Sequence, residues 1–294
     1  MPATPSTASL QVFSRTLSGL VAKAAPGIVA IHSHRSRASG FVWRPGLIVT
    51  PHEALAEEGE ITVALPDGET LPVTLAGRDP TTDVALLRVD RMDLQPVSLA
   101  AEPVAAGSIA IVVGAQEGAP TAAFGVVSLS GSEWRSLRGG EIDARIELDL
   151  SLRRSAEGGL VLDPGGQAFG MAVFGPRRRV LVIPSATIDR VAARLETHGR
   201  IPRGYLGLAL RTVPIEEAGV GAMVLGVEAG GPGAAAGVRQ GDVILAWNGD
   251  PIRSVRTLLK ALGPDSVTTI VRLSLKRAGE PVELSLTVGE RPEA

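Results

Sequence analysis

The stretch from residue 27 to about residue 182 is a succession of short β-type runs separated by turn signals, and this pattern restricts the possible folds most. The runs cover residues 28–32, 41–43, 47–49, 61–65, 84–89, 109–113, 126–129, 142–148, 160–162, 168–173 and 180–183. Turn residues punctuate them, for example at 66–68, 163–166 and 175–176. Short, closely spaced strands favour paired antiparallel barrels over alternating βαβ units. We therefore predict a mainly β protein.

Helices are predicted on both sides of this β region. Residues 10–24 carry apolar side chains at helical spacing, and Pro26 follows them. A second helix is expected over 185–198, and the residues after it, up to Pro202, form a linker. We therefore expect an N-terminal segment with a helix (1–26), a β domain (27–200) and a second module (203–290).

Several short motifs are spread over most of the chain. Residues 46–50 (Gly-Leu-Ile-Val-Thr), 77–87 (Gly-Arg-Asp-Pro-Thr-Thr-Asp-Val-Ala-Leu-Leu), 107–114, 125–128 and 183–185 carry them. Together they resemble the HtrA/Deg family, over roughly residues 10–290. The resemblance implies a trypsin-like double antiparallel β-barrel followed by a C-terminal PDZ domain of the α+β type.

The resemblance also implies a catalytic triad, but its histidine position holds a glutamate. In the family, that histidine lies three residues after the threonine of the preceding strand, and here this residue is Glu53. His52 lies one position earlier, and the spacing to the run at 61–63 favours Glu53 in register. Asp83 fits the position of the aspartate. A shifted arrangement that uses His52 stays open as an alternative.

The serine position also holds a glutamate. The family pattern Gly-Asn-Ser-Gly-Gly corresponds to Ser-Ala-Glu-Gly-Gly at 155–159, so Glu157 replaces the nucleophile. Ser155 replaces a glycine that lets the oxyanion-binding turn form. A carboxylate there repels the negative charge that catalysis must stabilise. The alternative is that Ser155 is a displaced nucleophile, which forms a shifted triad with His52 and Asp83.

The family geometry implies that Glu53, Asp83 and Glu157 share one cleft. Like charges at close range do not all ionise easily. We therefore expect a retained proton, a bound cation, or an ion pair with Arg153 or Arg154. Divalent-cation binding at this carboxylate cluster is one hypothesis, and a solvated acidic cleft without a ligand is the simpler one.

The turn at 175–179 (Gly-Pro-Arg-Arg-Arg) is much shorter than the family's connection at this place. In an active enzyme, that connection builds part of the specificity pocket. Its loss is consistent with a scaffold that no longer selects substrate side chains. The three arginines form either a solvated turn or a binding patch, and we expect the former.

The second module resembles a PDZ domain. Residues 203–208 (Arg-Gly-Tyr-Leu-Gly-Leu) are similar to the loop that binds a peptide carboxylate, and the strand after it offers an edge for a peptide strand. Ser254 is expected to cap the helix that forms the other wall of the groove. The predicted peptide-binding residues are Tyr205, Leu206, Gly207, Leu208, Val255 and Leu258, with Leu259 as a further candidate.

Composition excludes some classes of function. The net charge of −2 gives no general attraction to nucleic acid or to anionic membranes. Cysteine is absent, which excludes disulfides and thiolate chemistry, and we expect neither a cofactor nor a metal.

Residues 1–14 contain no Lys or Arg and no apolar core, so no signal peptide is seen. We therefore expect a cytoplasmic protein, or a periplasmic one if translation starts upstream.

The sequence thus predicts an HtrA-like protein without catalytic activity. We expect it to bind C-terminal or extended peptides of partner proteins through its PDZ domain, as a scaffold or regulator. An active serine endopeptidase with His52, Asp83 and Ser155 is the main alternative. The resemblance also suggests a homo-oligomer, a trimer in the family, with Phe13 as a candidate contact.

Overall fold

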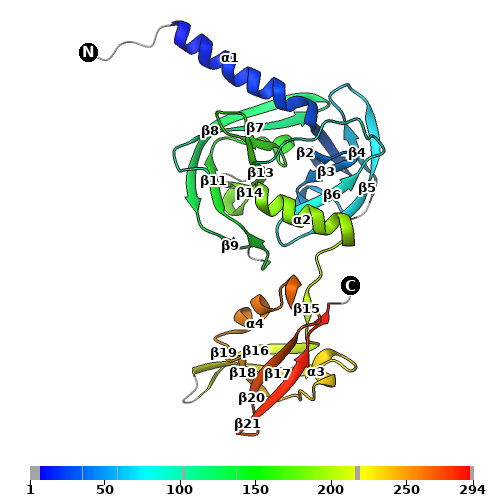
Figure 1. Ribbon diagram of the computed structural model, residues 1–294, viewed down its shortest axis with the longest axis vertical. Coiled ribbons are helices and arrows are strands. Elements are labelled where there is room, and N and C mark those ends of the chain that lie inside the picture. Colours follow the sequence, from blue (N-terminus) through cyan, green and yellow to red (C-terminus); the bar gives the residue numbers. More distant parts are fainter. Residues whose placement is uncertain are drawn as a thin grey trace, which may run out of the picture. The chain divides into compact units, whose positions relative to one another are not determined.

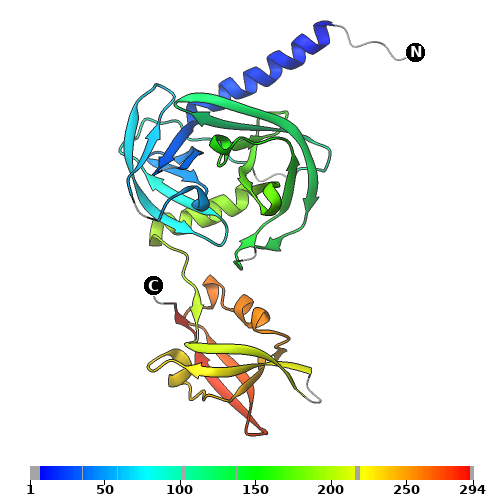
Figure 2. The same cartoon turned by 180° about the vertical axis from the view of Figure 1, so that it is seen from behind.

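The computed structural model describes residues 7–34, 36–57, 59–100, 103–136, 138–215 and 219–291. The chain divides into two compact units, Met1–Arg200 and Ile201–Ala294 (Figures 1 and 2). Strands dominate both units, so the predicted mainly β class is confirmed.

The first barrel closes in the strand order β1-β2-β3-β6-β5-β4, and all neighbours are antiparallel. The strands are β1 (Ile28–Ser33), β2 (Ser36–Arg44), β3 (Leu47–Thr50), β4 (Ile61–Ala64), β5 (Thr70–Asp79) and β6 (Val84–Arg88). Val29, Ile48 and Leu87 are fully buried in its core. Alternating inward side chains from each strand fill the barrel, as in other small barrels.

The second barrel closes in the order β11-β14-β13-β12-β7-β8. Its strands are β7 (Ile109–Gln116), β8 (Ala119–Gly131), β11 (Arg145–Asp149), β12 (Leu160–Leu162), β13 (Ala168–Phe174) and β14 (Val180–Pro184). Val112, Val161 and Ala172 are buried in its core. A separate hairpin of β9 (Trp134–Arg135) and β10 (Glu141–Ile142) projects between β8 and β11.

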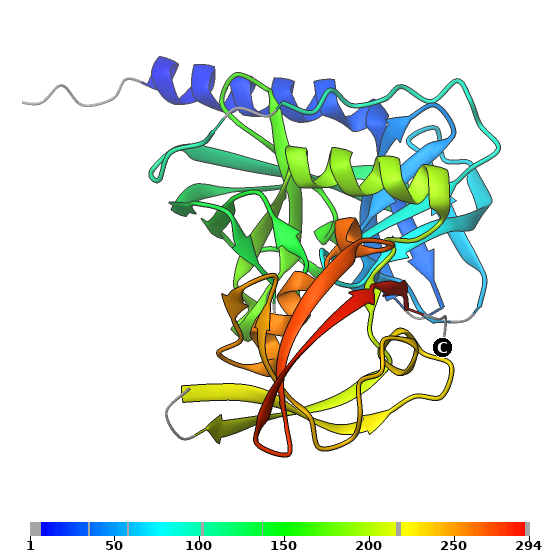
Figure 3. The ribbon, with the colours of Figure 1, turned by 60° about the horizontal axis from the view of Figure 1, so that its bottom comes forward.

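Two helices accompany the barrels. Helix α2 (Ser185–His198) ends at Gly199, whose φ of 70° is the left-handed conformation that glycine adopts without strain. It packs on β5 and β6 of one barrel and on β13 and β14 of the other (Figure 3). Trp43 fixes it further by donating its indole N–H to Asp189 at 2.6 Å.

Helix α1 (Thr7–Ala24) touches the barrels only lightly, at β7 and β8. The ring of Phe13 meets that of Phe124 on β8 edge to face at 5.8 Å. Leu10 is 61% exposed and Phe13 42% exposed. Within the described part of the chain, no helix is long and apolar enough to span a membrane.

The second unit is built on one sheet in the order β16-β17-β18-β20-β21, with β16 at an edge. The strands are β15 (Gly204–Tyr205), β16 (Leu208–Ile215), β17 (Gly219–Val227), β18 (Val243–Trp247), β19 (Asp250–Pro251), β20 (Ile270–Arg277), β21 (Glu280–Thr287) and β22 (Gly289–Glu290). Helices α3 (Pro232–Ala235) and α4 (Val255–Ala261) complete it. Ser254 caps α4 as predicted, since its Oγ accepts the N–H of Thr257 at 3.1 Å.

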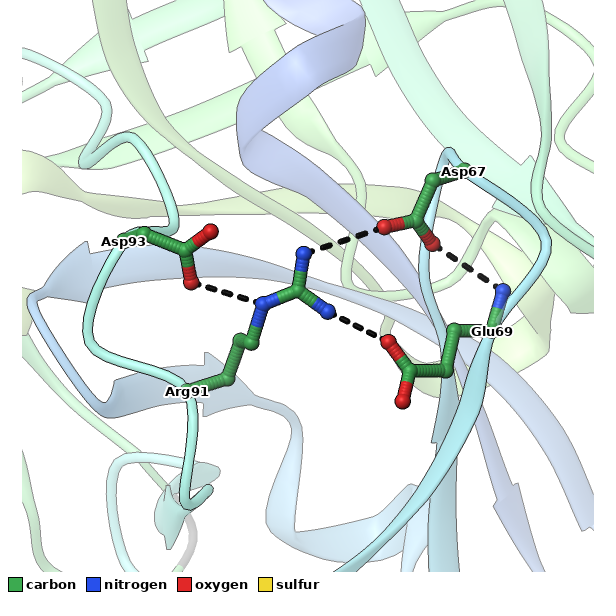
Figure 4. Close-up of polar contacts among 4 residues, drawn as sticks. All are labelled: Asp67, Glu69, Arg91 and Asp93. Carbon is green, nitrogen blue, oxygen red and sulfur yellow. Dashed lines mark hydrogen bonds and ion pairs between the residues drawn. The ribbon is translucent and has the colours of Figure 1, made fainter.

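An ion network joins two connecting segments of the first barrel. The guanidinium of Arg91 donates to Asp93 at 2.6 Å, to Asp67 at 3.2 Å and to Glu69 (Figure 4). Asp67 also accepts the N–H of Glu69 at 3.0 Å. One cation thus ties the segment after β6 to the β4–β5 turn.

The structure differs from the predicted strands at several places, among them β9, which lies in no predicted run. Strand β5 was not predicted, because Pro72, Gly77 and its polar residues weaken the β pattern. Gly77 is needed there, since a Cβ on it would lie 2.3 Å from the carbonyl oxygen of Gly199. The single run predicted over 142–148 is divided into β10 and β11.

Candidate functional site

Asp83 and Glu53 lie side by side where the first barrel ends. Asp83 occupies the β5–β6 connection, and Glu53 lies in a short 3₁₀ turn (His52–Ala54) after β3. The Oδ1 atom of Asp83 accepts the backbone N–H of Glu53 at 2.8 Å. The aspartate is thus directed at the backbone of residue 53.

Asp83 is a buried carboxyl group in an acidic surrounding. Burial raises its pKa to about 7, and the charges of Glu53 and Glu157 act in the same direction. The hydrogen bond from the Glu53 backbone and the charge of Arg138 oppose the rise. Its φ of 59° is unusual for a residue with a side chain. Asp83 therefore retains a proton up to about neutral pH.

Glu157 faces the same cleft from the second barrel. It follows the 3₁₀ turn Arg154–Ala156, and its Oε1 accepts the backbone N–H of Phe174 at 3.3 Å. Burial raises the pKa of Glu157, and Glu53 contributes to the rise. Each of the three carboxylates thus lies in the field of another, as the family geometry implied.

The counter-charge in this cleft is Arg138. Its guanidinium lies 3.1 Å from the carboxylate of Glu53 and donates to the carbonyl of Pro80 at 3.1 Å. The β9–β10 hairpin that carries it is fixed to the first barrel, because Ser136 donates its hydroxyl to the carbonyl of Thr81 at 2.6 Å. We expected Arg153 or Arg154 in this role, and the charge of Arg154 does lower the pKa of Glu157.

His52 forms no hydrogen bond to a catalytic partner through Nδ1 in the described part of the chain. Its Nδ1 is buried and has no hydrogen-bond partner within the described residues. Burial lowers the pKa of His52, and the charges of Arg78 and Arg138 lower it further. Only its backbone N–H contacts Asp83, at 3.3 Å from the carbonyl oxygen.

Ser155 is held by contacts that do not involve a base. Its hydroxyl donates to Oε1 of Gln116 at 3.4 Å. Its carbonyl accepts the buried hydroxyl of Ser39 at 2.7 Å, and Ser39 in turn accepts the N–H of Ala115 at 2.8 Å. In the described ranges, no hydrogen bond joins Ser155 to His52.

The backbone of the serine-position turn uses its own N–H groups. The N–H of Ala156 donates to the carbonyl of Arg153 at 2.9 Å, and that of Glu157 donates to Arg154 at 3.1 Å. An oxyanion hole requires free donors that point at the reacting oxygen. The N–H of Glu157 is thus occupied inside the turn.

The three carboxylates do not form a coordination sphere. Among the residues that the structure describes, no group of three or more His, Asp or Glu side chains is arranged to hold a metal ion. Glu53 directs its carboxylate to Arg138, and Glu157 directs its own to a backbone N–H.

A second candidate site lies at the start of the C-terminal unit. Gly207 has a φ of 66°, and its carbonyl accepts the N–H of Glu228 at 2.8 Å. The carbonyl of Leu206 accepts the N–H of Gly233 at 2.7 Å. The N–H groups of Leu206 and Gly207 donate to no other backbone group in the described residues.

The walls of this second site are β16 and α4. Leu208 and Val255 are half-buried against the domain core, whereas Leu206 and Leu258 are buried within it. Leu259 is 59% exposed.

Two further contacts close the ends of this site. The hydroxyl of Tyr205 donates to Glu228. At the other end, the N–H of Val255 donates to the Thr212 hydroxyl at 3.1 Å and thereby ties α4 to β16.

Comparison with known families agrees with this architecture. Residues 38–171 match the trypsin-like peptidase domain, and residues 204–288 match the PDZ domain. A probable periplasmic serine endoprotease DegP-like of Chlamydia pneumoniae is 30% identical over 273 residues, which are 87% of this chain and 56% of that protein. The protein of the same name from Rhizobium meliloti (strain 1021) is 30% identical over 275 residues, 88% of this chain and 54% of its own. The chain thus spans about half the length of these curated relatives.

Solved structures give the same result. The serine endoprotease from Yersinia pestis has a TM-score of 0.75 at 25% identity and covers 94% of this chain and 98% of its own. The HtrA-type protease AlgW with a decapeptide has a TM-score of 0.74 at 23% identity, and covers 95% and 99%. Fold and motifs define a trypsin-like double barrel joined to a PDZ domain. The chain belongs to the HtrA family.

One expectation from the sequence is contradicted by these relatives. We predicted a cytoplasmic location, whereas the curated relatives are named periplasmic endoproteases. The absence of a basic, apolar leader in residues 1–14 was the reason for the wrong prediction, and that reason concerns only the start of the chain.

Proposed function

We propose that this chain is a catalytically inactive HtrA-type protein that holds peptides of partner proteins through its PDZ domain. The observation that carries the proposal is the turn at Glu157. A carboxylate replaces the nucleophile, and the N–H of the same residue bonds to the carbonyl of Arg154. Acyl transfer requires an activated nucleophile and free oxyanion donors. Residue 157 supplies neither the nucleophile nor a free N–H donor.

The surroundings of His52 and Ser155 support the same proposal. Among the residues that the structure describes, Nδ1 of His52 has no hydrogen-bond partner, and Ser155 bonds to Gln116. A general base must lie within hydrogen-bond reach of its nucleophile, directly or through one water. The degenerate positions Glu53, Asp83 and Glu157 therefore describe the site better than the shifted triad.

Labelling with a fluorophosphonate, followed by digestion of casein, tests this proposal. We expect neither labelling nor cleavage, beside an active HtrA enzyme as the positive control. The second candidate is an active endopeptidase, which the names of the curated relatives favour. Labelling that disappears in Ser155→Ala would establish that candidate and overturn ours.

Cation binding at the carboxylate cluster is the weaker alternative. A bound divalent ion stabilises the folded state by mass action. Thermal unfolding with and without millimolar Mg²⁺, Ca²⁺ or Mn²⁺ is expected to give the same Tm. A rise in Tm that is lost in Glu157→Gln would support cation binding instead.

Peptide binding is proposed at the loop 205–208 and along β16. The free N–H groups of Leu206 and Gly207 suit a terminal carboxylate, and β16 offers an unpaired edge. Leu208, Val255 and the exposed Leu259 are proposed to contact the peptide side chains, above Leu258 in the core. The related protease AlgW has been solved with a decapeptide.

We further infer a periplasmic location and a homo-oligomer. The first follows from the names of the curated relatives. The second rests on the exposed apolar face that Leu10 and Phe13 of α1 form with Phe124 of β8. The molar mass in solution, measured by light scattering, is expected to exceed that of one chain and to fall in Phe13→Ser. A single-chain mass for the wild type would refute the oligomer.

A further inference from the structure

Four arginine side chains lie next to the cleft that holds Glu53, Asp83 and Glu157. We call Arg153, Arg154, Arg177 and Arg178 the arginine patch. All four side chains are exposed, and none forms an ion pair in the described residues. This exposed cluster of like charges, in which Arg154 also faces the carboxylate of Glu157, forms a local basic surface on a chain of net charge −2.

Two contacts bring the two halves of the patch together. The N–H of Phe174 donates to Glu157, the residue that follows the turn carrying Arg154. The guanidinium of Arg178 lies over the ring of Phe174, 5.5 Å from its centroid. One arginine of the patch thus lies over an apolar ring, and another, Arg154, acts on the partly buried carboxylate of Glu157.

The backbone at the second half of the patch is strained. Arg177 has φ 59° and ψ 27°, and Arg178 also has a φ of 59°. Two successive side-chain-bearing residues in the left-handed region carry a cost in free energy, since glycine would adopt this conformation without strain. Such strain is concentrated at functional sites. Here it holds two adjacent guanidinium groups on one exposed turn.

Two neighbouring arginines differ from those of the patch because they share an ion pair with one carboxylate. Arg145 lies 2.6 Å and Arg179 3.2 Å from the carboxylate of Glu147, which is 90% buried. Glu147 therefore offsets positive charge only at Arg145 and Arg179. The four guanidinium groups of the arginine patch remain available to a partner.

We propose that the arginine patch binds an acidic peptide segment of a partner protein, at a site separate from the PDZ groove. Guanidinium groups form paired hydrogen bonds with carboxylates. The cations come from two turns, which suits carboxylates spaced along an extended chain, and Phe174 adds an apolar contact between them. The partner thus meets the protein at two independent places.

The test uses a fluorescein-labelled hexaglutamate peptide with a C-terminal amide, and the full chain. The amide removes the carboxylate that the PDZ loop would recognise. Fluorescence anisotropy is expected to show binding that weakens as salt is added, and no binding of the matching hexaglutamine peptide. Equal binding of the two peptides would overturn the proposal.

The decisive variant is Arg177→Gly with Arg178→Gly. Glycine relieves the left-handed strain, so we expect an unchanged or higher Tm together with affinity weaker by at least about tenfold. Arg88→Gln on β6 is the matched control and is expected to bind like the wild type. Unchanged affinity in the double glycine variant would refute the site.

Two more measurements distinguish this site from the PDZ groove and from a lipid-binding surface. Gly207→Ala, which alters the PDZ loop, is expected to leave hexaglutamate binding unchanged, so failure of one site is distinguishable from failure of the other. Vesicles containing phosphatidylglycerol are expected not to bind. Binding of these vesicles without binding of hexaglutamate would assign the patch to a lipid surface and contradict the proposal.

Discussion

The carboxylate of Asp83 accepts the backbone N–H of Glu53 at 2.8 Å, while Glu53 directs its own carboxylate to Arg138 at 3.1 Å. An aspartate that would orient an imidazole in an active enzyme is thus bonded to the backbone of a residue of like charge. This side of the cleft is held by the backbone N–H of Glu53 and by Arg138 from the β9–β10 hairpin.

The first prediction concerns stability against pH. The pKa of Asp83 is about 7 in the folded protein, above its ordinary value of 3.8, so the folded state holds this proton longer than the unfolded state. Stability from this group is present below pH 4 and is lost as pH rises to about 7. Asp83→Asn is expected to remove that decline and to raise stability at pH 8 by up to about 4 kcal/mol.

Chemical denaturation of both proteins between pH 4 and pH 8 measures this effect. The groups that face Asp83 are Glu53, Glu157 and Arg138, and all three remain in the variant. Asp93→Asn, in the exposed network of Arg91, is the control: it keeps Asp83 and is expected to show the same decline as the wild type. Parallel curves for wild type and Asp83→Asn would contradict the prediction.

The second prediction concerns Arg138. Arg138→Gln removes the positive charge that lowers the Asp83 pKa, so this pKa is expected to rise further. Carboxyl-carbon NMR titration of Asp83 measures the shift. Since both partners of the Arg138–Glu53 pair are about half exposed, a double-mutant cycle with Glu53→Gln is expected to give only about 0.2–1 kcal/mol. An unchanged titration of Asp83 would show that Arg138 does not act on this carboxyl.

The third prediction concerns recovery of catalysis. Glu53→His with Glu157→Ser restores the triad side chains, yet the N–H groups of residues 156 and 157 stay bonded inside the turn. We expect this double variant to remain unlabelled by fluorophosphonate. Addition of Ser155→Gly frees the backbone to expose a donor, and labelling is expected to appear. Labelling of the double variant alone would show that the turn is no obstacle.

The fourth prediction concerns the PDZ loop. Gly207→Ala places a side chain at a φ of 66°, and its Cβ would lie 3.3 Å from the Cα of Gly231. Affinity for a peptide with a free C-terminal carboxylate is expected to fall at least about tenfold, in titration calorimetry. Gly279→Ala in the β20–β21 turn has a similar backbone strain and an open surrounding, and is expected to leave binding intact. Equal losses in both variants would indicate general destabilisation.

The fifth prediction concerns the Arg91 network. Arg91→Met removes the cation shared by Asp67, Glu69 and Asp93, which leaves three carboxylates facing one another. The Tm is expected to fall, and to fall less in 1 M NaCl because salt screens the exposed charges. Arg88→Met serves as the control. A loss of Tm that is independent of salt would point to lost packing of the side-chain stem.

Much of the architecture followed from local patterns in the sequence. The helix that begins at Ser185 and the cap at Ser254 appeared where spacing and capping residues indicated. Strand β5 did not, because its residues are chosen by close packing against α2 at Gly77 rather than by β propensity. Tertiary contacts of this kind leave no period in the sequence.

The candidate site was predicted in part. The proximity of Glu53, Asp83 and Glu157 followed from the family register, and the structure brings their charges together. The role of Arg138 did not follow, since it lies 85 positions after Glu53 and the pair forms only through the fold.

The hydrogen bond between Val255 and Thr212 has a consequence for selectivity. An extended chain that pairs with β16 from Leu208 passes Thr212 after about four residues, or about 13 Å. Peptide residues farther than this from the C-terminal end are expected to lie outside the space between β16 and α4. We therefore expect the proposed groove to recognise only the last few residues of a bound chain, whatever fold precedes them.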